Sequence, residues 1–241
     1  MTTRVFSHRG RTEAGVDTVE NTVAAFRTAR SLGCDGVELD VRCTADGVLV
    51  VHHDPEVSGA GPLHLVARHQ LPPYVALLGE ALDACDGMLV NVEIKAAPQR
   101  ERSHGPTRTS DADTLTAELT ATTLVSLGWT DRVIVSSFEP TILDAVRRTE
   151  PTLALGRLLE WSVDAMAELE VVEDHGWQAI HPFVAQVGPS LVEAAHGAGV
   201  AVHAWTVNAR GDLEAMADLG VDAVITDRPG EALEVMRSRP R

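Results

Sequence analysis

The sequence is poor in several residue types, and each shortage narrows the kind of protein it can encode. Aromatic residues make up 4% of the 241 residues, with Tyr74 the only tyrosine, so the core must consist of Val, Leu, Ala and Ile. The odd set Cys34, Cys43 and Cys85 has no C-x-x-C spacing, which indicates reduced thiols and excludes a disulfide framework or zinc site. No apolar run could span a bilayer, and Met1–Phe6 has no signal-peptide character. We therefore expect a soluble, cytoplasmic protein without a transmembrane segment.

Positive charge is also scarce. Twenty basic residues face 35 acidic ones, which gives a formal net charge of −15 and argues against a general nucleic-acid binder. Lys95 is the only lysine in the chain. The glycine-rich loops that bind dinucleotides or nucleoside triphosphates are absent, and Ser136-Ser137-Phe138 lacks the G-x-S-x-G context of a serine nucleophile. A small anionic substrate remains possible, because a cation and a few basic side chains can make one positive pocket in a negative protein.

The chain alternates between strand-like and helix-like patterns from end to end. Strands are predicted at Arg4–His8, Gly36–Cys43, Val48–His53, Met88–Lys95, Val133–Phe138, Leu153–Leu158, Ala179–Pro182, Val200–Val207 and Ala223–Thr226. Helices are predicted at Val19–Leu32, Leu77–Ala84, Ala112–Leu127, Thr141–Thr149, Val163–His175, Ser190–Ala198, Gly211–Leu219 and Glu231–Arg237. This alternation is typical of an α/β fold with a parallel sheet.

Nine predicted strands are one more than an eight-stranded barrel needs. The second and third strands are separated only by a tight turn, so they must be antiparallel, because parallel neighbours need a long crossover. A turn centred between Ala45 and Asp46 would bring His53 back opposite Glu38. Eight parallel strands then remain, each followed by a helix. The sequence therefore predicts a (β/α)₈ TIM barrel in a single domain, residues 1–241, with a short hairpin and insertion after the second barrel strand.

Acidic side chains stand near the ends of two predicted barrel strands. Glu38 and Asp40 are two residues apart and share one face of their strand, and Glu93 occupies the corresponding part of the next barrel strand. At the catalytic rim of a barrel, three such carboxylates would repel one another unless a hard cation such as Mg²⁺ or Ca²⁺ lies between them. The alternative is that each carboxylate is paired with an arginine, for instance Arg9 or Arg42.

Basic and aromatic residues at the same strand ends suggest the rest of a phosphate-ester site. His8 and His53 can move protons near neutral pH, although a lone histidine is more often structural. Arg9 and Lys95 could bind phosphate oxygens, or could be held by the carboxylates. Trp205 could form an apolar wall for the substrate or serve as a large core residue.

A polar segment follows the strand that ends at Lys95. It spans Ala97–Asp113 and contains four basic residues, Arg100, Arg102, His104 and Arg108. We expect either a mobile, solvated loop or a lid that contacts an anionic substrate.

The order of these motifs resembles the glycerophosphodiester phosphodiesterase family. The matching strings are S-H-R-G at Ser7–Gly10, E-N-T at Glu20–Thr22, G-V-E-L-D-V-R at Gly36–Arg42, D-G-V-L-V-V-H-H-D-P at Asp46–Pro55, V-E-I-K at Val92–Lys95, V-S-S-F at Val135–Phe138, A-W-T-V-N at Ala204–Asn208 and V-I-T-D-R-P at Val224–Pro229. Singly these strings are modest, but together they run along nearly the whole chain in order.

The resemblance implies a barrel enzyme that hydrolyses a glycerophosphodiester to sn-glycerol 3-phosphate and an alcohol. It implies that the three carboxylates hold one divalent cation, that the two histidines are the catalytic pair, and that Arg9 and Lys95 contact phosphate. In the family's usual scheme, a glycerol hydroxyl attacks phosphorus and water then opens the cyclic phosphate. Such an attack benefits from a nucleophile that is already tethered nearby.

Other readings of the same barrel remain. A lysophospholipase D-like enzyme would act on a lipid, and a non-catalytic barrel would only bind an anionic metabolite. A metal-dependent amidohydrolase would need H-x-H where the chain has His8-Arg9-Gly10. The family's insertion is short here, at Glu56–Ala76, and holds one aromatic residue, Tyr74. The sequence therefore leaves open the alcohol head group, the choice between Mg²⁺ and Ca²⁺, and the oligomeric state.

Overall fold

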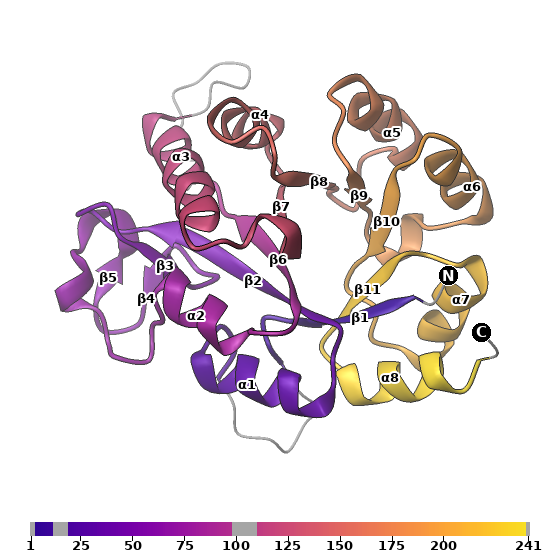
Figure 1. Ribbon diagram of the computed structural model, residues 1–241, viewed down its shortest axis with the longest axis horizontal. Coiled ribbons are helices and arrows are strands. Elements are labelled where there is room, and N and C mark those ends of the chain that lie inside the picture. The colour runs from indigo at the N-terminus through magenta and orange to yellow at the C-terminus, as the bar shows by residue number, and fades with distance from the viewer. Residues whose placement is uncertain (1–2, 12–18, 98–109, 240–241) are drawn as a thin grey trace.

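The eight barrel strands form a closed ring (Figure 1). The computed structural model describes residues 3–11, 19–97 and 110–239. Within these residues one nine-stranded sheet runs in the order β1-β11-β10-β9-β8-β7-β6-β2-β3, and β1 also pairs with β2, which closes the barrel. The parallel strands are β1 (Arg4–His8), β2 (Gly36–Cys43), β6 (Leu89–Ile94), β7 (Val133–Ser137), β8 (Ala154–Leu158), β9 (Ala179–His181), β10 (Ala201–Ala204) and β11 (Ala223–Thr226). The predicted TIM barrel is confirmed.

Helices surround the ring of strands on the outside (Figure 1). They are α1 (Val23–Leu32), α2 (Leu78–Ala84), α3 (Asp111–Ser126), α4 (Pro140–Thr149), α5 (Ala165–Asp174), α6 (Pro189–Gly197), α7 (Arg210–Leu219) and α8 (Pro229–Arg237). The main core lies between helices and strands, and β2 shows why. Val37, Leu39 and Val41 are fully buried in that core. The alternate residues, Glu38 and Asp40, must therefore face the barrel interior.

The hairpin after β2 is confirmed, but its predicted register is wrong by one residue. β3 (Leu49–Val51) is antiparallel to β2, with Cys43 opposite Leu49. The turn is centred on Asp46, because Thr44 N–H donates to Val48 O over 3.0 Å and the Thr44 hydroxyl donates to Asp46 over 2.6 Å. The ladder therefore brings the amide of His52, and not His53, to Asp40, where it donates to the carbonyl over 2.9 Å.

The insertion is more ordered than the sequence indicates. A two-stranded sheet of β4 (Glu56–Val57) and β5 (Gly61–Pro62) precedes two short 3₁₀ turns, Leu63–Leu65 and Arg68–Gln70. It encloses a small core of its own, formed by Val50, Val57, Leu63, Val66, Leu71 and Val75. The insertion lies at one side of the barrel, next to the hairpin (Figure 1). It therefore extends the barrel at the side where the hairpin lies.

Helix α1 starts four residues after the predicted Val19. Thr22 caps it by accepting a hydrogen bond from the Ala25 amide, and Asn21 before it has a left-handed backbone with φ 58°. Residues 19–22 therefore precede the helix and do not belong to its first turn. The segment 97–113, expected to be either a solvated loop or a lid, lies largely outside the described residues. Among the described helices, none is long and apolar enough to cross a membrane.

Two histidines, His181 and His203, are buried and in contact with each other. The rings of His181 and His203 lie 4.6 Å apart, and His203 also contacts Phe6 at 6.0 Å between ring centroids. Burial lowers the pKa of His203 to about 4, although Asp222 opposes the shift. A histidine in the unfolded chain titrates near 6.5, so between those values the unfolded state binds a proton that the folded state does not. The free energy of unfolding must therefore fall as the pH falls through this window.

We expect His203→Leu to reduce this acid sensitivity. One group shifted from 6.5 to about 4 contributes on the order of 3 kcal/mol to the difference between the two ends of the window. Urea unfolding at pH 7 and pH 4.5 measures the difference in each protein. His69→Leu, at an exposed histidine, is the control and should keep the wild-type difference. If His203→Leu also keeps it, the protonation of His203 is not the cause.

Candidate active site

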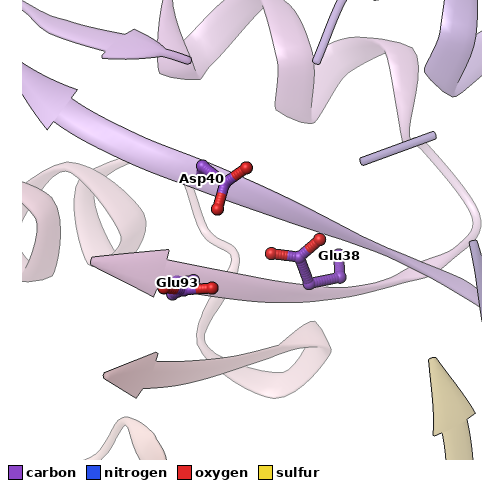
Figure 2. A group of neighbouring side chains, drawn as sticks. All are labelled: Glu38, Asp40 and Glu93. Carbon is purple, nitrogen blue, oxygen red and sulfur yellow. The ribbon is translucent and has the colours of Figure 1, made fainter. Parts of the chain in front are cut away.

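Three buried carboxylates meet at the rim of the barrel. Glu38 and Asp40 come from β2 and Glu93 from β6, and the register of the two strands places Asp40 directly beside Glu93. One oxygen from each residue lies within 4.8 Å of the others. Figure 2 shows the three carboxyl groups between the neighbouring strands. Their exposed fractions are 3%, 0% and 6%, so water can screen their mutual repulsion only weakly.

Two cations face these carboxylates. Lys95 Nζ lies 3.0 Å from Asp40 Oδ1 and 2.5 Å from Glu93 Oε1. Arg9 Nε lies 3.1 Å from Asp40 Oδ2, and the Arg9 amide donates to Glu38 Oε2 over 3.0 Å. The carboxylates therefore hold both Lys95 and Arg9, but among the described residues only Asp40 of the three is paired with an arginine side chain. Arg42, however, donates to the carbonyls of His53 and Ala96 over 2.8 and 3.2 Å.

The two cations do not compensate the three acids equally. Burial, followed by the charges of Asp40 and Glu93, raises the pKa of Glu38 well above its ordinary value. Burial also raises the pKa of Glu93, against the opposing effect of Lys95. For Asp40, burial would raise the pKa, but Lys95 and Arg9 together lower it below its ordinary value. Glu38 is thus the acid that most lacks a positive partner.

The residues fit a divalent cation. Glu38 Oε1 is buried and has no hydrogen-bond partner in the described part of the chain. Three carboxylates offer only oxygen donors, which hard cations such as Mg²⁺ and Ca²⁺ prefer. A cation there would relieve the repulsion that raises the pKa of Glu38.

His8, at the end of β1, lies beside this cluster. Its Nε2 is 3.8 Å from Glu38 Oε2, and its Nδ1 is 2.8 Å from Asp227 Oδ1. Asn208 Nδ2 in turn donates to the other Asp227 oxygen over 2.8 Å. Asp227 can therefore stabilise the tautomer of His8 that carries its proton on Nδ1, which leaves a lone pair on Nε2, the nitrogen nearer to Glu38. The sequence identified His8, but Asp227 and Asn208 stand there only in strings that match the family, without a role.

The ring of His53, like that of His8, has an aspartate at its Nδ1, despite the shifted hairpin register. Its Nδ1 lies 2.8 Å from Asp54 Oδ1. Burial lowers the pKa of His53, and the charges of Lys95 and Arg9 add to that effect against the charge of Asp40. The neighbouring His52 bonds instead to the Glu56 carbonyl at 3.2 Å. His53 therefore shares an electrostatic environment with the carboxylate cluster and His52 points elsewhere.

Trp205 follows β10 and is half-buried near the site. Its indole N–H donates to the His181 carbonyl over 2.8 Å, and its ring meets Phe138 edge-on at 5.4 Å. Lys95 Nζ lies 6.0 Å from the centre of the same Phe138 ring. The structure thus places two aromatic rings, Trp205 and Phe138, near the ammonium group, and a role of Trp205 as an apolar wall for the substrate stays a prediction.

Comparison with known proteins shows to which family the chain belongs. The model of the glycerophosphoryl diester phosphodiesterase family matches residues 8–231. The chain belongs to this family. Membership makes it a phosphoric diester hydrolase.

Relatives of the phosphodiesterase match along nearly its whole length. A glycerophosphodiester phosphodiesterase of Caldanaerobacter subterraneus subsp. tengcongensis is 30% identical over 98% of this chain and 99% of its own. One of Bacillus altitudinis is 26% identical over 97% and 98%. The structure of an Oleispira antarctica phosphodiesterase in complex with the product sn-glycerol-3-phosphate has the same fold, with a TM-score of 0.82 at 22% identity over 98% of this chain and 97% of that one.

The E-N-T string between β1 and α1 also contacts the charged cluster. Glu20 Oε1 lies 2.9 Å from Arg9 Nη1, and the second Glu20 oxygen holds Arg11 at 2.6 Å. Asn21 Nδ2 donates to Asp40 Oδ2 over 2.7 Å. The string matches the family, but the sequence predicts no role for either residue. The predicted helix from Val19 includes Glu20 and Asn21, whereas α1 begins only at Val23 and leaves both residues before it.

We expect Asp227→Asn to lower kcat by about 10-fold to 10²-fold, because the amide no longer fixes the His8 ring and its tautomer as a carboxylate does. Binding of the cation should be unchanged, because Asp227 is not among the three carboxylates. Steady-state kinetics and the rise in Tm on adding Mg²⁺ or Ca²⁺ measure the two quantities. Asp212→Asn, at an exposed position on α7, is the matched control. Wild-type kcat in Asp227→Asn would show that this contact is dispensable.

Proposed function

We propose that the protein hydrolyses glycerophosphodiesters to sn-glycerol 3-phosphate and an alcohol, with a divalent cation, Mg²⁺ or Ca²⁺, at Glu38, Asp40 and Glu93. The observation that carries the proposal is a buried carboxylate cluster with two histidines near it: His8 Nε2 lies 3.8 Å from Glu38, and the charge of Asp40 acts on the pKa of His53. Each imidazole has its Nδ1 held by an aspartate, His8 by Asp227 and His53 by Asp54. Family membership and the product complex of the Oleispira antarctica relative support a small phosphodiester as substrate.

The basic residues would bind the phosphate. In the structure Lys95 and Arg9 form ion pairs with carboxylates, which offset their positive charges. A bound cation would polarise the phosphoryl group and offset the carboxylate charge. Lys95 and Arg9 could then donate to phosphate oxygens, and Trp205 and Phe138 would offer an apolar surface to the glycerol carbons.

The two histidines would carry out proton transfer. An imidazole that donates its Nδ1–H to an aspartate presents an Nε2 lone pair, which can accept the proton of the attacking hydroxyl. The other imidazole, in its protonated form, would give a proton to the leaving alcohol oxygen. If a glycerol hydroxyl attacks first, the cyclic phosphate is opened by water in a second step, and the two histidines exchange roles. The tethered hydroxyl needs no separate binding step.

The experiment that tests this function identifies the products. The purified protein is incubated with glycerophosphocholine, glycerophosphoethanolamine, bis(p-nitrophenyl) phosphate and lysophosphatidylcholine, each with Mg²⁺, Ca²⁺ or EDTA. We expect sn-glycerol 3-phosphate with choline or ethanolamine from the first two substrates, and no phosphocholine. Faster release of choline from lysophosphatidylcholine would favour the lipid hydrolase instead. No turnover of any substrate with either cation would favour a non-catalytic binding barrel.

A further inference from the structure

A cavity of about 370 Å³ lies beside His53. Three segments form its walls. They are residues 19–22 before α1, residues 51–54 at the end of the hairpin, and residues 74–75 at the end of the insertion. Because His53 is one of the two proposed acid-base residues, this cavity adjoins the place where the substrate's ester oxygens would react. A volume of this size holds a small head group and not a long acyl chain.

The walls of this cavity are apolar and acidic. Val51 and Val75 are buried and line it, and Val19 adds an exposed apolar side chain. Glu20 and Asp54 are its two carboxylates. Among the described residues that line the cavity there is no lysine or arginine, although Arg9 and Arg11 bind Glu20 from outside the lining.

A second cavity near the site differs in charge. It measures about 200 Å³ and is lined by Arg42 and Lys95 as well as Asp113. Asp113 is already engaged, because it accepts hydrogen bonds from the amides of Ala97 and Ser110. A cationic group would therefore be repelled from the side of Lys95 and would prefer the cavity beside His53. The net charge of −15 favours the approach of such a group.

Tyr74 gives the larger cavity a specific chemistry. It is 48% exposed, and its ring has no aromatic, cationic or hydrogen-bond partner in the described ranges. An aromatic face near carboxylates is the arrangement with which proteins bind quaternary ammonium groups. The buried valines can contact the methyl groups of such a cation. His53 holds Oδ1 of Asp54, but this side chain is 71% exposed and its Oδ2 can attract the charge of the cation.

We propose that this cavity binds the alcohol half of the substrate and selects a methylated, cationic amino alcohol such as choline, with Tyr74 as the residue that recognises the cation. The proposal rests on the proposed glycerophosphodiesterase function, because that function supplies the alcohol. It adds a preference among alcohols, which neither the family nor the reaction fixes.

The first test does not require hydrolysis. Tyr74 is the only tyrosine, so protein labelled with 3-fluorotyrosine gives one ¹⁹F resonance that reports on this cavity alone. Titration with choline should shift the resonance in a saturable way. Titration with 3,3-dimethylbutan-1-ol, which has the shape of choline without its charge, should give a much smaller shift. Equal shifts, or none at millimolar choline, would overturn the proposal.

The second test measures selectivity in catalysis. We expect kcat/KM for glycerophosphocholine to exceed that for the 3,3-dimethylbutyl ester by about tenfold. Tyr74→Leu should make the two values nearly equal, whereas Tyr74→Phe, which keeps the ring, should retain the difference. Equal values in the wild type, or an equal loss for both substrates in Tyr74→Leu, would overturn the proposal.

The two tests separate this proposal from the proposed function. A saturable choline shift in a protein that hydrolyses neither ester would leave the cation pocket in place and reject the glycerophosphodiesterase function. Hydrolysis of both esters at the same rate, with no choline shift, would do the reverse.

Discussion

Replacing His8 or His53 by alanine should lower kcat by at least about 10²-fold, the usual contribution of one general acid or base. The structure gives each imidazole the support that such a role needs. Asp227 holds Nδ1 of His8, and Asp54 holds Nδ1 of His53, both at 2.8 Å. The proposed reaction uses one histidine as base and the other as acid, so the two act as a unit. The kcat of the double variant should therefore be only slightly lower than that of the less active single variant.

A matched control separates proton transfer from damage to the hairpin. His52 is adjacent to His53, but it bonds to the Glu56 carbonyl and takes no part in the cluster. We expect His52→Ala to keep kcat within a few-fold of the wild type. Unchanged turnover in His8→Ala or His53→Ala would remove that histidine from the mechanism. Turnover of glycerophosphocholine at saturating substrate is the measurement.

The sequence predicts the barrel and its polar strand ends because both depend on short-range periodicity. Glu38 and Asp40 are two residues apart on one strand, so their shared face follows from the pleat alone. The partner of His8 could not be predicted in this way. Asp227 is 219 residues away along the chain and reaches His8 only because β11 closes the barrel against β1. Such pairs depend on the tertiary fold and not on local pattern.

The hairpin shows a second limit, which is set by turn chemistry. Predicting a turn between Ala45 and Asp46 assumed the shortest connection, but the Thr44 side chain accepts a hydrogen bond from the Val48 amide and lengthens the turn. The resulting shift of one residue places His52, which precedes His53, opposite Asp40. His53 lies beyond the end of β3 at Val51, and it is still close enough to Asp40, Lys95 and Arg9 for their charges to affect its pKa.

The second large effect should come from the cation. We expect EDTA to abolish hydrolysis and Mg²⁺ or Ca²⁺ to restore it. Glu93→Gln should weaken binding of the cation by at least roughly tenfold, because fewer carboxylate charges lower the affinity of such sites. The rise in Tm on adding the cation measures binding without any substrate, since a ligand of the folded state stabilises it. Glu118→Gln, at an exposed glutamate on α3, is the matched control.

The same binding should depend on pH in a defined direction. Burial and the neighbouring carboxylates raise the pKa of Glu38 well above its ordinary value, so near that pKa a proton and the cation compete for one carboxylate. Affinity for the cation should therefore increase as the pH rises through this range, and Glu38→Gln, which cannot lose a proton, should bind weakly with a flatter pH dependence. Isothermal titration at several pH values measures both. Because the amide oxygen of glutamine can itself coordinate a cation, the decisive variants are Glu93→Ala and Glu38→Ala, and normal cation affinity in either would exclude that residue as a ligand.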